Sequence, residues 1–209
     1  MSAVMLKVDR IQSSTTNLGP GKRAVVWFHG CTRGCEHCIA SEMNRSDEYE
    51  SFDAKGLAER ICSIPGIEGV SLSGGEPFQQ DPYELSLFLK KLKTRSNLGI
   101  MVYTGYLLSE LKGEARFSEL LNQIDLLVDG PYVYELDGGE LWRGSSNQSF
   151  HFLTNRYKSL ARDLERSKGR QIDVTFEKGL EFAFAGIPPK DFKQKLSHRL
   201  RGSGMDIKW

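Results

Sequence analysis

The sequence predicts an α/β fold built from parallel βαβ units, followed by a smaller α+β appendage at the C-terminal end. Short apolar runs of strand length alternate with longer segments whose apolar residues recur at helical spacing. Each of these apolar runs leads into a turn that contains glycine. Beyond about Leu153 the pattern changes to short alternating strands and a basic helix. Strands and helices that alternate at such intervals form parallel sheets.

The first part of the chain is expected to contain seven elements. In chain order these are a strand at Arg23–His29, a helix at Phe52–Ile64, a strand at Gly69–Leu72, a helix at Pro82–Lys93, a strand at Gly99–Tyr103, a mostly helical segment at Leu107–Gln123 and a strand at Ile124–Val128. The helix at Pro82–Lys93 is amphipathic, because apolar residues fall at i, i+3, i+4 and i+7 from Leu85. The strand at Arg23–His29 is a continuous apolar run, which indicates a buried strand.

The turns that follow the four predicted strands carry the polar and glycine residues of interest. They are the cysteine loop, Ser73–Pro77, Thr104–Tyr106 and Asp129-Gly130. In a parallel sheet the active site lies at the carboxyl ends of the strands. We therefore expect these four turns to lie together at one edge of the sheet.

Residues 154–209 are expected to form a C-terminal extension, and residues 1–153 a core. The extension is predicted to contain a charged helix at Tyr157–Ser167 and, after Pro188-Pro189, a basic helix at Lys190–Leu200. Two alternating runs between them indicate a β-hairpin with its turn at Glu177-Lys178-Gly179. The alternating apolar residues are Ile172, Val174, Phe176, Leu180, Phe182 and Phe184.

The composition is that of an ordinary globular protein, with 39% hydrophobic and 26% charged residues among 209. No run approaches the ~20 apolar residues of a membrane span, and the first residues do not form a secretory signal. We expect a cytoplasmic protein with no membrane contact. A net charge of +1 gives no indication of nucleic-acid binding. From Arg156 onward, 13 Lys/Arg face 7 Asp/Glu, which indicates either a solvated helical face or a surface for an acidic partner.

Three of the four cysteines lie within eight residues, as Cys31-x3-Cys35-x2-Cys38. Such closely spaced thiols indicate a reducing compartment and a metal site. Thiolates suit iron–sulfur clusters, zinc and copper(I), but a structural zinc site normally takes four ligands. Cys62 falls in the apolar pattern of a helix and is expected to be buried, so His29 and His37 are nearer candidates for a fourth ligand. Three thiolates on a [4Fe–4S] cluster leave one iron open to another molecule.

This cysteine spacing, with Gly74-Gly75-Glu76-Pro77 about 40 residues later, resembles the radical SAM superfamily. The resemblance implies that Cys31, Cys35 and Cys38 bind a [4Fe–4S] cluster whose fourth iron is chelated by S-adenosylmethionine (SAM). It also implies that one electron from the cluster breaks a carbon–sulfur bond of SAM. The products are methionine and a 5′-deoxyadenosyl radical that abstracts a hydrogen atom. The cofactors carry this chemistry, while the protein positions them and excludes water.

The same resemblance assigns a group of residues to SAM binding: Ser73, Gly74, Gly75, Glu76, Pro77, Thr104, Asp129 and His37. Glycines let the backbone approach a ligand closely. Three residues also have a simpler interpretation. Asp129 either faces SAM or a monovalent cation, or caps a turn; Thr104 either bonds SAM or is a plain turn residue. His37 sits where the superfamily often has an aromatic ring, and it either stacks near adenine or lies in solvent.

A narrower resemblance is to the activating enzymes of anaerobic (class III) ribonucleotide reductase. The matching segments are Gly19–Arg23, Gly30-Cys31, Ser71–Pro77, Tyr103–Tyr106, Leu127–Gly130 and Trp142–Gln148, which fall within residues 8–153. The resemblance implies an incomplete (β/α) barrel of the radical SAM type. It implies hydrogen abstraction from a glycine of a large glycyl-radical partner, such as anaerobic ribonucleotide reductase, with flavodoxin or a similar protein as electron donor. The extension has no counterpart in that family.

Several side chains outside these motifs have expected positions. Arg23 could contact the SAM carboxylate or an acidic partner, but it is expected to be exposed at the start of its strand. Tyr132 and Tyr134 are expected to flank the cavity or pack at its rim. Arg143, Asn147 and Gln148 form a group with two open roles: contact with the partner's glycine loop, or a hydrogen-bond network that holds the last loop.

Three functions follow from these observations. The first is a glycyl-radical activase, which the series of motifs favours. The second is a radical SAM enzyme that modifies a peptide or small molecule, with the extension as its recognition element. The third is a zinc-bound interaction module without catalytic activity.

Overall fold

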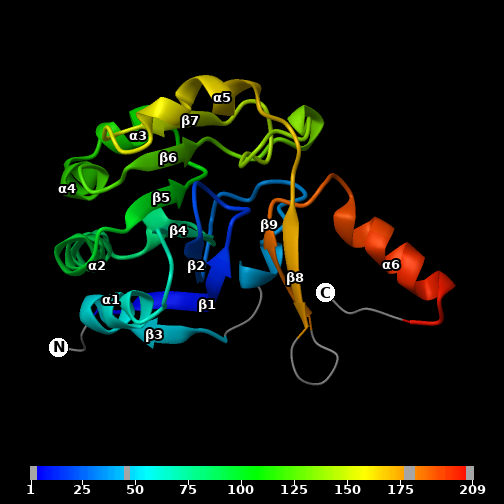
Figure 1. Cartoon of the computed structure of the whole chain (residues 1–209), viewed down its shortest axis with the longest axis horizontal. Helices are drawn as coiled ribbons and strands as arrows, with labels where there is room; N and C mark the ends of the chain where they lie inside the picture. The colour runs from blue at the N-terminus through cyan, green and yellow to red at the C-terminus, as the bar shows by residue number, and fades with distance from the viewer. Residues whose placement is uncertain (1–3, 45–47, 177–181, 206–209) are drawn as a thin grey trace.

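A mixed α/β fold with a largely parallel seven-stranded sheet is seen in a computed structural model, which describes residues 4–44, 48–176 and 182–205 (Figure 1). The strand order is β3-β1-β2-β4-β5-β6-β7, and β8 and β9 form a separate two-stranded sheet. The central four strands are parallel: β2 (Arg23–Phe28), β4 (Gly69–Gly74), β5 (Gly99–Tyr103) and β6 (Leu126–Asp129). All four were expected from their apolar runs, and their existence is confirmed.

Three further strands, absent from the sequence prediction, pair antiparallel at the two sides of the parallel group. They are β1 (Leu6–Thr15), β3 (Glu50–Phe52) and β7 (Ser149–Phe152). β1 pairs with β2 through two register shifts, and only some of its residues are buried. A strand with such an irregular burial pattern lacks the period of two by which a half-buried strand is found in a sequence.

Helices cover one face of this sheet. They are α1 (Ala54–Cys62), α2 (Pro82–Arg95), α3 (Leu108–Lys112) and α4 (Ser118–Leu121). The described residues also include the short 3-10 helices η1 (Ser41–Asn44), η2 (Pro77–Gln79), η3 (Ala115–Phe117), η4 (Tyr134–Leu136) and η5 (Lys158–Leu160). The Asp53 and Asp81 carboxylates accept backbone N–H groups at the first turns of α1 and α2. In the described part of the chain, no helix has the length and apolar character needed to cross a membrane.

One helical prediction is confirmed and one needs correction. The segment Leu107–Gln123 is mostly helical, as expected, and its helix is divided where Gly113 follows α3 and the chain restarts as η3 and α4. Cys62, expected inside the core, is exposed at the end of α1. The buried face of α1 is formed by Ala54, Leu57, Ala58 and Ile61. Cys62 follows Ile61 by one residue, so it points about 100° away from it.

The C-terminal extension contains η5, α5 (Ala161–Arg166), a hairpin of β8 (Ile172–Phe176) and β9 (Phe182–Gly186), and α6 (Phe192–Gly202). The antiparallel hairpin is confirmed, although its expected turn at 177–179 lies outside the described residues. The predicted helix at Tyr157–Ser167 is shorter and starts as a 3-10 turn. The predicted basic helix begins at Phe192 rather than Lys190.

The hairpin packs on the sheet face that the helices leave open. Val25 and Trp27 of β2 share a cluster with Ala185 of β9, which is fully buried. Their neighbours Val26 and Phe28 pack with the helices instead, because successive side chains of a strand point to opposite faces. Polar contacts reinforce this packing: Thr15 Oγ1 donates to Asp173 Oδ2 at 2.5 Å, and Arg10 Nη2 donates to the Phe184 carbonyl at 3.0 Å.

Arg23 is fully buried at the amino-terminal end of β2, which corrects the expectation that it is exposed. Its Nε donates to Ser71 Oγ at 2.8 Å, and Nη2 donates to the carbonyls of Val70 and Gly99 at 2.9 and 3.0 Å. Nη1 donates to the Pro20 carbonyl and to Tyr157 Oη. A Cβ on Gly69 would lie 2.5 Å from Nη1, so glycine at the start of β4 leaves room for this guanidinium. Arg23 thus joins three strands to the first residues of the extension.

We expect Arg23→Leu to lower the free energy of unfolding by about 3 kcal/mol, because it leaves several buried carbonyls without donors. Urea unfolding of the purified protein measures this. Arg116→Leu is the matched control, because Arg116 is exposed and its contacts are with the nearby residues Glu114 and Phe117. A loss below 1 kcal/mol in Arg23→Leu, or equal losses in both variants, would contradict the structural role.

Candidate functional site

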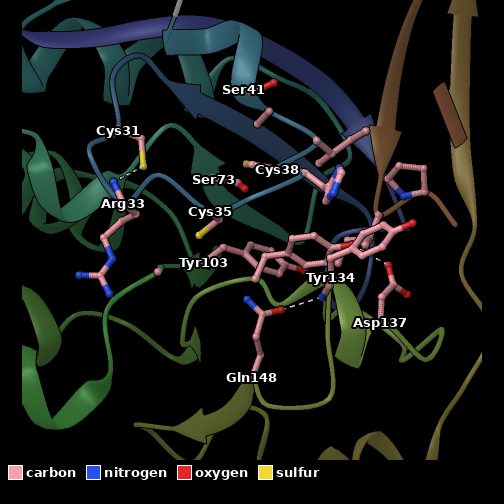
Figure 2. Close-up of a pocket in the computed structure, with 18 of the residues that line it drawn as sticks. Cys31, Arg33, Cys35, Cys38, Ser41, Ser73, Tyr103, Tyr134, Asp137 and Gln148 are labelled. Carbon is pink, nitrogen blue, oxygen red and sulfur yellow. Dashed lines mark hydrogen bonds between the residues drawn. The ribbon is translucent and has the colours of Figure 1, made fainter. Parts of the chain in front are cut away.

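A cavity of about 390 Å³ lies at the carboxyl ends of the parallel strands (Figure 2). Its walls include residues that follow β2, β4, β5 and β6, as expected for a site in a parallel sheet. Figure 2 shows Cys31 and Cys35 across the cavity from Tyr134 and Asp137. The predicted site residues that line it are Cys31, Cys35, Cys38, His37, Ser73, Gly74, Gly75, Glu76 and Thr104.

The cysteine loop leaves β2 and places three thiols at the cavity wall. All three cysteines are half-buried. The loop is held by backbone hydrogen bonds, in which the Cys38 N–H donates to the Cys35 carbonyl and the Gly30 N–H to the Met43 carbonyl, each at 3.3 Å. Cys31 Sγ accepts the Arg33 N–H at 3.4 Å. Burial raises the pKa of the Cys31 thiol, an effect that this hydrogen bond opposes.

The glycine turn after β4 is bonded directly to the start of the cysteine loop. The Gly75 N–H donates to the Phe28 carbonyl at 2.7 Å, and the Glu76 N–H donates to the Gly30 carbonyl at 2.8 Å. A Cβ on Gly75 would collide with the Gly30 carbonyl oxygen. Gly74 adopts a φ of 97°, which side-chain-bearing residues rarely adopt. Both glycines are therefore required for the turn to lie against the loop.

Glu76 is 2% exposed and connects this turn to the next one along the sheet. Its carboxylate accepts the Thr104 hydroxyl and the Gly105 N–H, both at 2.8 Å, and the Phe78 N–H at 3.0 Å. Burial raises the pKa of Glu76, although these three donors favour the charged form. Three protein donors already use the carboxylate, so its visible role is to hold two turns together.

Gln79 and Gln80 contribute contacts that the sequence analysis missed. Gln79 Oε1 accepts the Thr32 N–H at 2.9 Å, and its Nε2 donates to Thr32 Oγ1 and Tyr106 Oη. Gln80 Nε2 donates to the His29 carbonyl at 2.9 Å. Both glutamines brace the cysteine loop, Gln79 from the end of η2 and Gln80 from the residue that follows it. Their position shortly after the Gly-Gly-Glu-Pro turn is the only sequence signal for this role.

Two of the predicted site residues do not line the cavity. Pro77 is buried and begins η2. Asp129 is 5% exposed, accepts the Leu108 N–H at 2.7 Å, and lies 2.9 Å from His151 Nε2. The simpler interpretation of Asp129, a carboxylate that caps a local turn, therefore describes its contacts.

Residues from the extension also line the cavity. Residues 187–194 line it together with Tyr132, Tyr134 and Gln148. The Tyr134 hydroxyl donates to Asp191 Oδ1 at 2.7 Å, and Lys190 Nζ lies 3.7 Å from the centre of the Tyr134 ring. The exposed His37 ring lies 4.3 Å from the same tyrosine ring. Tyr134 thus sits between the cysteine loop and the extension.

The last loop of the core is held by a hydrogen-bond network, one of the two roles left open for its polar residues. Gln148 Oε1 accepts the Gly144 N–H at 2.7 Å, and its Nε2 donates to the Gly130 carbonyl at 2.9 Å. Asn147 Nδ2 donates to the Pro131 carbonyl, and Arg143 Nη1 to the Gln148 carbonyl, both at 2.8 Å. These bonds fix the rim of the cavity.

Arg170 attaches the extension to that loop. No pattern in the sequence predicted this role for Arg170. Its side chain is 4% exposed and pairs with Asp137 at 2.9 Å and Glu140 at 3.8 Å. It also donates to the carbonyls of Arg143, Gly144 and Pro188 at 2.9, 2.7 and 3.0 Å. One guanidinium therefore holds the core loop and the cavity-lining segment of the extension together.

The donor set of the cavity fits an iron–sulfur cluster. Among the described residues, no three Cys, His, Asp or Glu side chains converge on a point that a single metal ion could share. A [4Fe–4S] cluster needs no such convergence, because each thiolate binds a different iron. Three thiols border an open cavity, and the adjacent wall is glycine backbone without side chains.

Comparison with known proteins places this site in a family context. The family described as "4Fe-4S single cluster domain" matches residues 17–151, so the extension lies outside the match. The chain is 34% identical to the anaerobic ribonucleoside-triphosphate reductase-activating protein of Salmonella typhi, over 65% of this chain and 91% of that protein. It is 32% identical to the protein of that name from Enterobacteria phage T4, over 68% of this chain and 92% of that protein.

More distant similarity extends to a second kind of activating enzyme. The pyruvate formate-lyase-activating enzyme of Clostridium pasteurianum is 28% identical over 70% of this chain and 61% of that enzyme. Among solved structures, QueE from Escherichia coli gives a TM-score of 0.38 at 14% identity, over 48% of this chain and 53% of QueE.

Arg170→Met is expected to lower the free energy of unfolding by about 3–5 kcal/mol, because the Asp137 and Glu140 carboxylates stay buried without a counter-charge. It should also expose residues 154–205 to limited proteolysis before the core is cut. Arg166→Met removes an exposed arginine of α5 and is the control. Unchanged cleavage of the extension in Arg170→Met would show that other contacts hold it.

Glu76→Gln is expected to change how stability depends on pH. The folded-state pKa of Glu76 is raised above its ordinary value of 4.5, so its contribution to stability is fully present below 4.5 and is lost as pH rises through the folded value. Glutamine cannot ionise. The stability of the wild type minus that of the variant should therefore fall as the pH rises above 4.5, measured by urea unfolding of metal-free protein. A difference that stays constant or rises would contradict the raised pKa.

Proposed function

This chain belongs to the 4Fe-4S single cluster domain family and to the family of the anaerobic ribonucleoside-triphosphate reductase-activating proteins, and from that premise we propose that it is a radical SAM glycyl-radical-activating enzyme. One observation carries the proposal most directly. Three half-buried thiols border the same cavity as a glycine turn that is hydrogen-bonded to their loop.

Cys31, Cys35 and Cys38 are the proposed ligands of the [4Fe–4S] cluster. The bound cluster supplies the electron that reductively cleaves SAM, and the resulting 5′-deoxyadenosyl radical abstracts hydrogen. The protein's own part is to position and shield the reactants. Ser73, Gly74 and Gly75 offer backbone at the cavity wall, and the Thr104 hydroxyl borders the same space.

The remaining predicted SAM residues have supporting roles in this proposal. Glu76 holds the glycine turn and the Thr104-Gly105 turn in register. Pro77 starts η2, from which Gln79 braces the cysteine loop. Asp129 caps the turn at Leu108. His37 borders the cavity beside Tyr134, where its ring is available to a flat ligand.

The proposed partner is an anaerobic ribonucleoside-triphosphate reductase, with hydrogen abstracted from a glycine of that protein. The names of the relatives support this assignment. We also propose flavodoxin or a similar protein as electron donor, and a cytoplasmic location, which the three free thiols favour. Residues 1–153 are proposed to form an incomplete (β/α) barrel, with residues 154–209 as an added element.

A second candidate function is the radical modification of a peptide or small molecule. The observation that favours it is the wall formed by residues 187–194, which lie outside the family match and line the cavity. A cavity of about 390 Å³ can hold a small substrate as well as a single protruding loop.

The deciding experiment starts from protein reconstituted anaerobically with iron and sulfide. We expect reduced protein and SAM to yield 5′-deoxyadenosine, and addition of the reductase from the same organism to yield a glycyl radical by EPR. Cys31→Ala, Cys35→Ala and Cys38→Ala should each lose iron, sulfide and both products. Cys62→Ala, which alters an exposed thiol on α1, is the control and should retain them.

The products that are observed distinguish the two candidate functions. Wild-type protein that forms no 5′-deoxyadenosine would exclude both enzyme functions. Formation of 5′-deoxyadenosine without a glycyl radical, together with a modified peptide or small molecule, would favour the second function over the first.

A further inference from the structure

The segment that precedes helix α6 is held in place at the cavity. This segment is held by Arg170 through the Pro188 carbonyl, and by the Tyr134 hydroxyl through Asp191. Asp191 has a φ of 61°, so the chain turns sharply before the helix starts. Phe192 packs against Phe184 of the hairpin, with ring centres 5.6 Å apart. The first turn of α6 is therefore fixed to the body of the protein.

The same turn also forms part of the cavity wall. Phe192, Lys193 and Gln194 line the cavity together with Pro188 and Pro189. From there α6 runs outward, away from the side of the sheet that α1 and α2 cover (Figure 1). A protein that brings a glycine into the cavity must approach these lining residues, and α6 starts among them.

Helix α6 carries several basic residues and no acidic ones. Between Phe192 and Gly202 there is no Asp or Glu, and the basic residues are Lys193, Lys195, Arg199 and Arg201. Lys195 and Arg199 are exposed and lie four residues apart, hence on one face of the helix. Leu196 and Leu200 are half-buried and form a short apolar strip beside them.

The rest of the chain has a net charge of the opposite sign. Residues 156–209 carry 13 Lys/Arg and 7 Asp/Glu, so residues 1–155 carry a net charge of −5 against the chain's total of +1. An acidic partner surface is therefore attracted to the extension and repelled by the core. Charge asymmetry of this kind orients a partner as it approaches.

We propose that α6 is a docking helix for an acidic surface on the glycyl-radical partner, next to the segment that enters the cavity. This inference rests on the proposed function for the identity of the partner. Basic residues at the rim and a small apolar centre match the usual anatomy of a protein interface. A membrane surface is the poorer match, because Phe192 is already packed on the hairpin and only two leucines remain.

The test is a charge reversal on α6 in the full-length, cluster-loaded protein. Lys195→Glu/Arg199→Glu is expected to raise the Kd for the reductase of the same organism roughly tenfold at low salt, with a smaller effect at high salt. Arg199→Glu alone keeps the Lys195–Asp191 ion pair intact, and this variant should raise the Kd by a smaller factor. Formation of 5′-deoxyadenosine without the partner should be unchanged in both variants.

Arg60→Glu/Lys158→Glu is the matched control, because it makes the same change in net charge at exposed positions on α1 and η5. This control should bind the reductase as the wild type does. Equal Kd values for wild type and the α6 variants would overturn the inference, and so would equal losses in the α6 and control variants.

Two further results keep the inference separate from the proposed function. Co-sedimentation with vesicles of phosphatidylcholine and phosphatidylserine that is lost in the α6 variants, with unchanged reductase binding, would assign α6 to a membrane instead and overturn the docking role. A wild-type protein that forms no 5′-deoxyadenosine and no glycyl radical would instead reject the proposed function itself.

Discussion

The site depends on the backbone contact between the turn after β4 and the loop after β2. Gly75 and Glu76 donate to the carbonyls of Phe28 and Gly30, and a side chain at position 75 would prevent this approach. The contact places glycine backbone beside the thiols of the cysteine loop. Glu76 then extends the connection to the turn after β5, through its bonds to Thr104 and Gly105. Parallel pairing of β2, β4 and β5 brings these turns within reach.

Two buried arginines attach the extension to this core at opposite ends of the sheet. Arg23 joins the amino-terminal ends of β2, β4 and β5 to Tyr157. Arg170 joins the last core loop to Pro188, and so fixes the segment that lines the cavity. Each guanidinium satisfies several carbonyl groups that would otherwise be buried without donors, which explains why a planar group with five donors is used at both positions. The extension is thus part of the cavity as well as an addition to the family's common core.

Elements with a strong local pattern were predictable, and those defined by pairing were not. The four parallel strands and α2 follow from apolar runs and helical spacing. The antiparallel strands β1, β3 and β7 were missed, because many of their side chains are only partly buried and pairing with a neighbouring strand defines them. Arg23 was placed in solvent because an arginine at the start of a strand is usually exposed, whereas here Gly69 leaves space for it inside the fold.

The sequence by itself determined the chemistry: three closely spaced thiols, a glycine turn after a buried strand, and the alternation that brings both to one sheet edge. Soft donors and missing side chains are properties of residues and their order, so they can be read without coordinates. Only the tertiary structure decided that Glu76 bonds two turns to one another, that Asp129 does not line the cavity, and that the extension supplies a wall. Those outcomes depend on contacts between residues far apart in the chain, such as Tyr134 and Asp191, which no local pattern encodes.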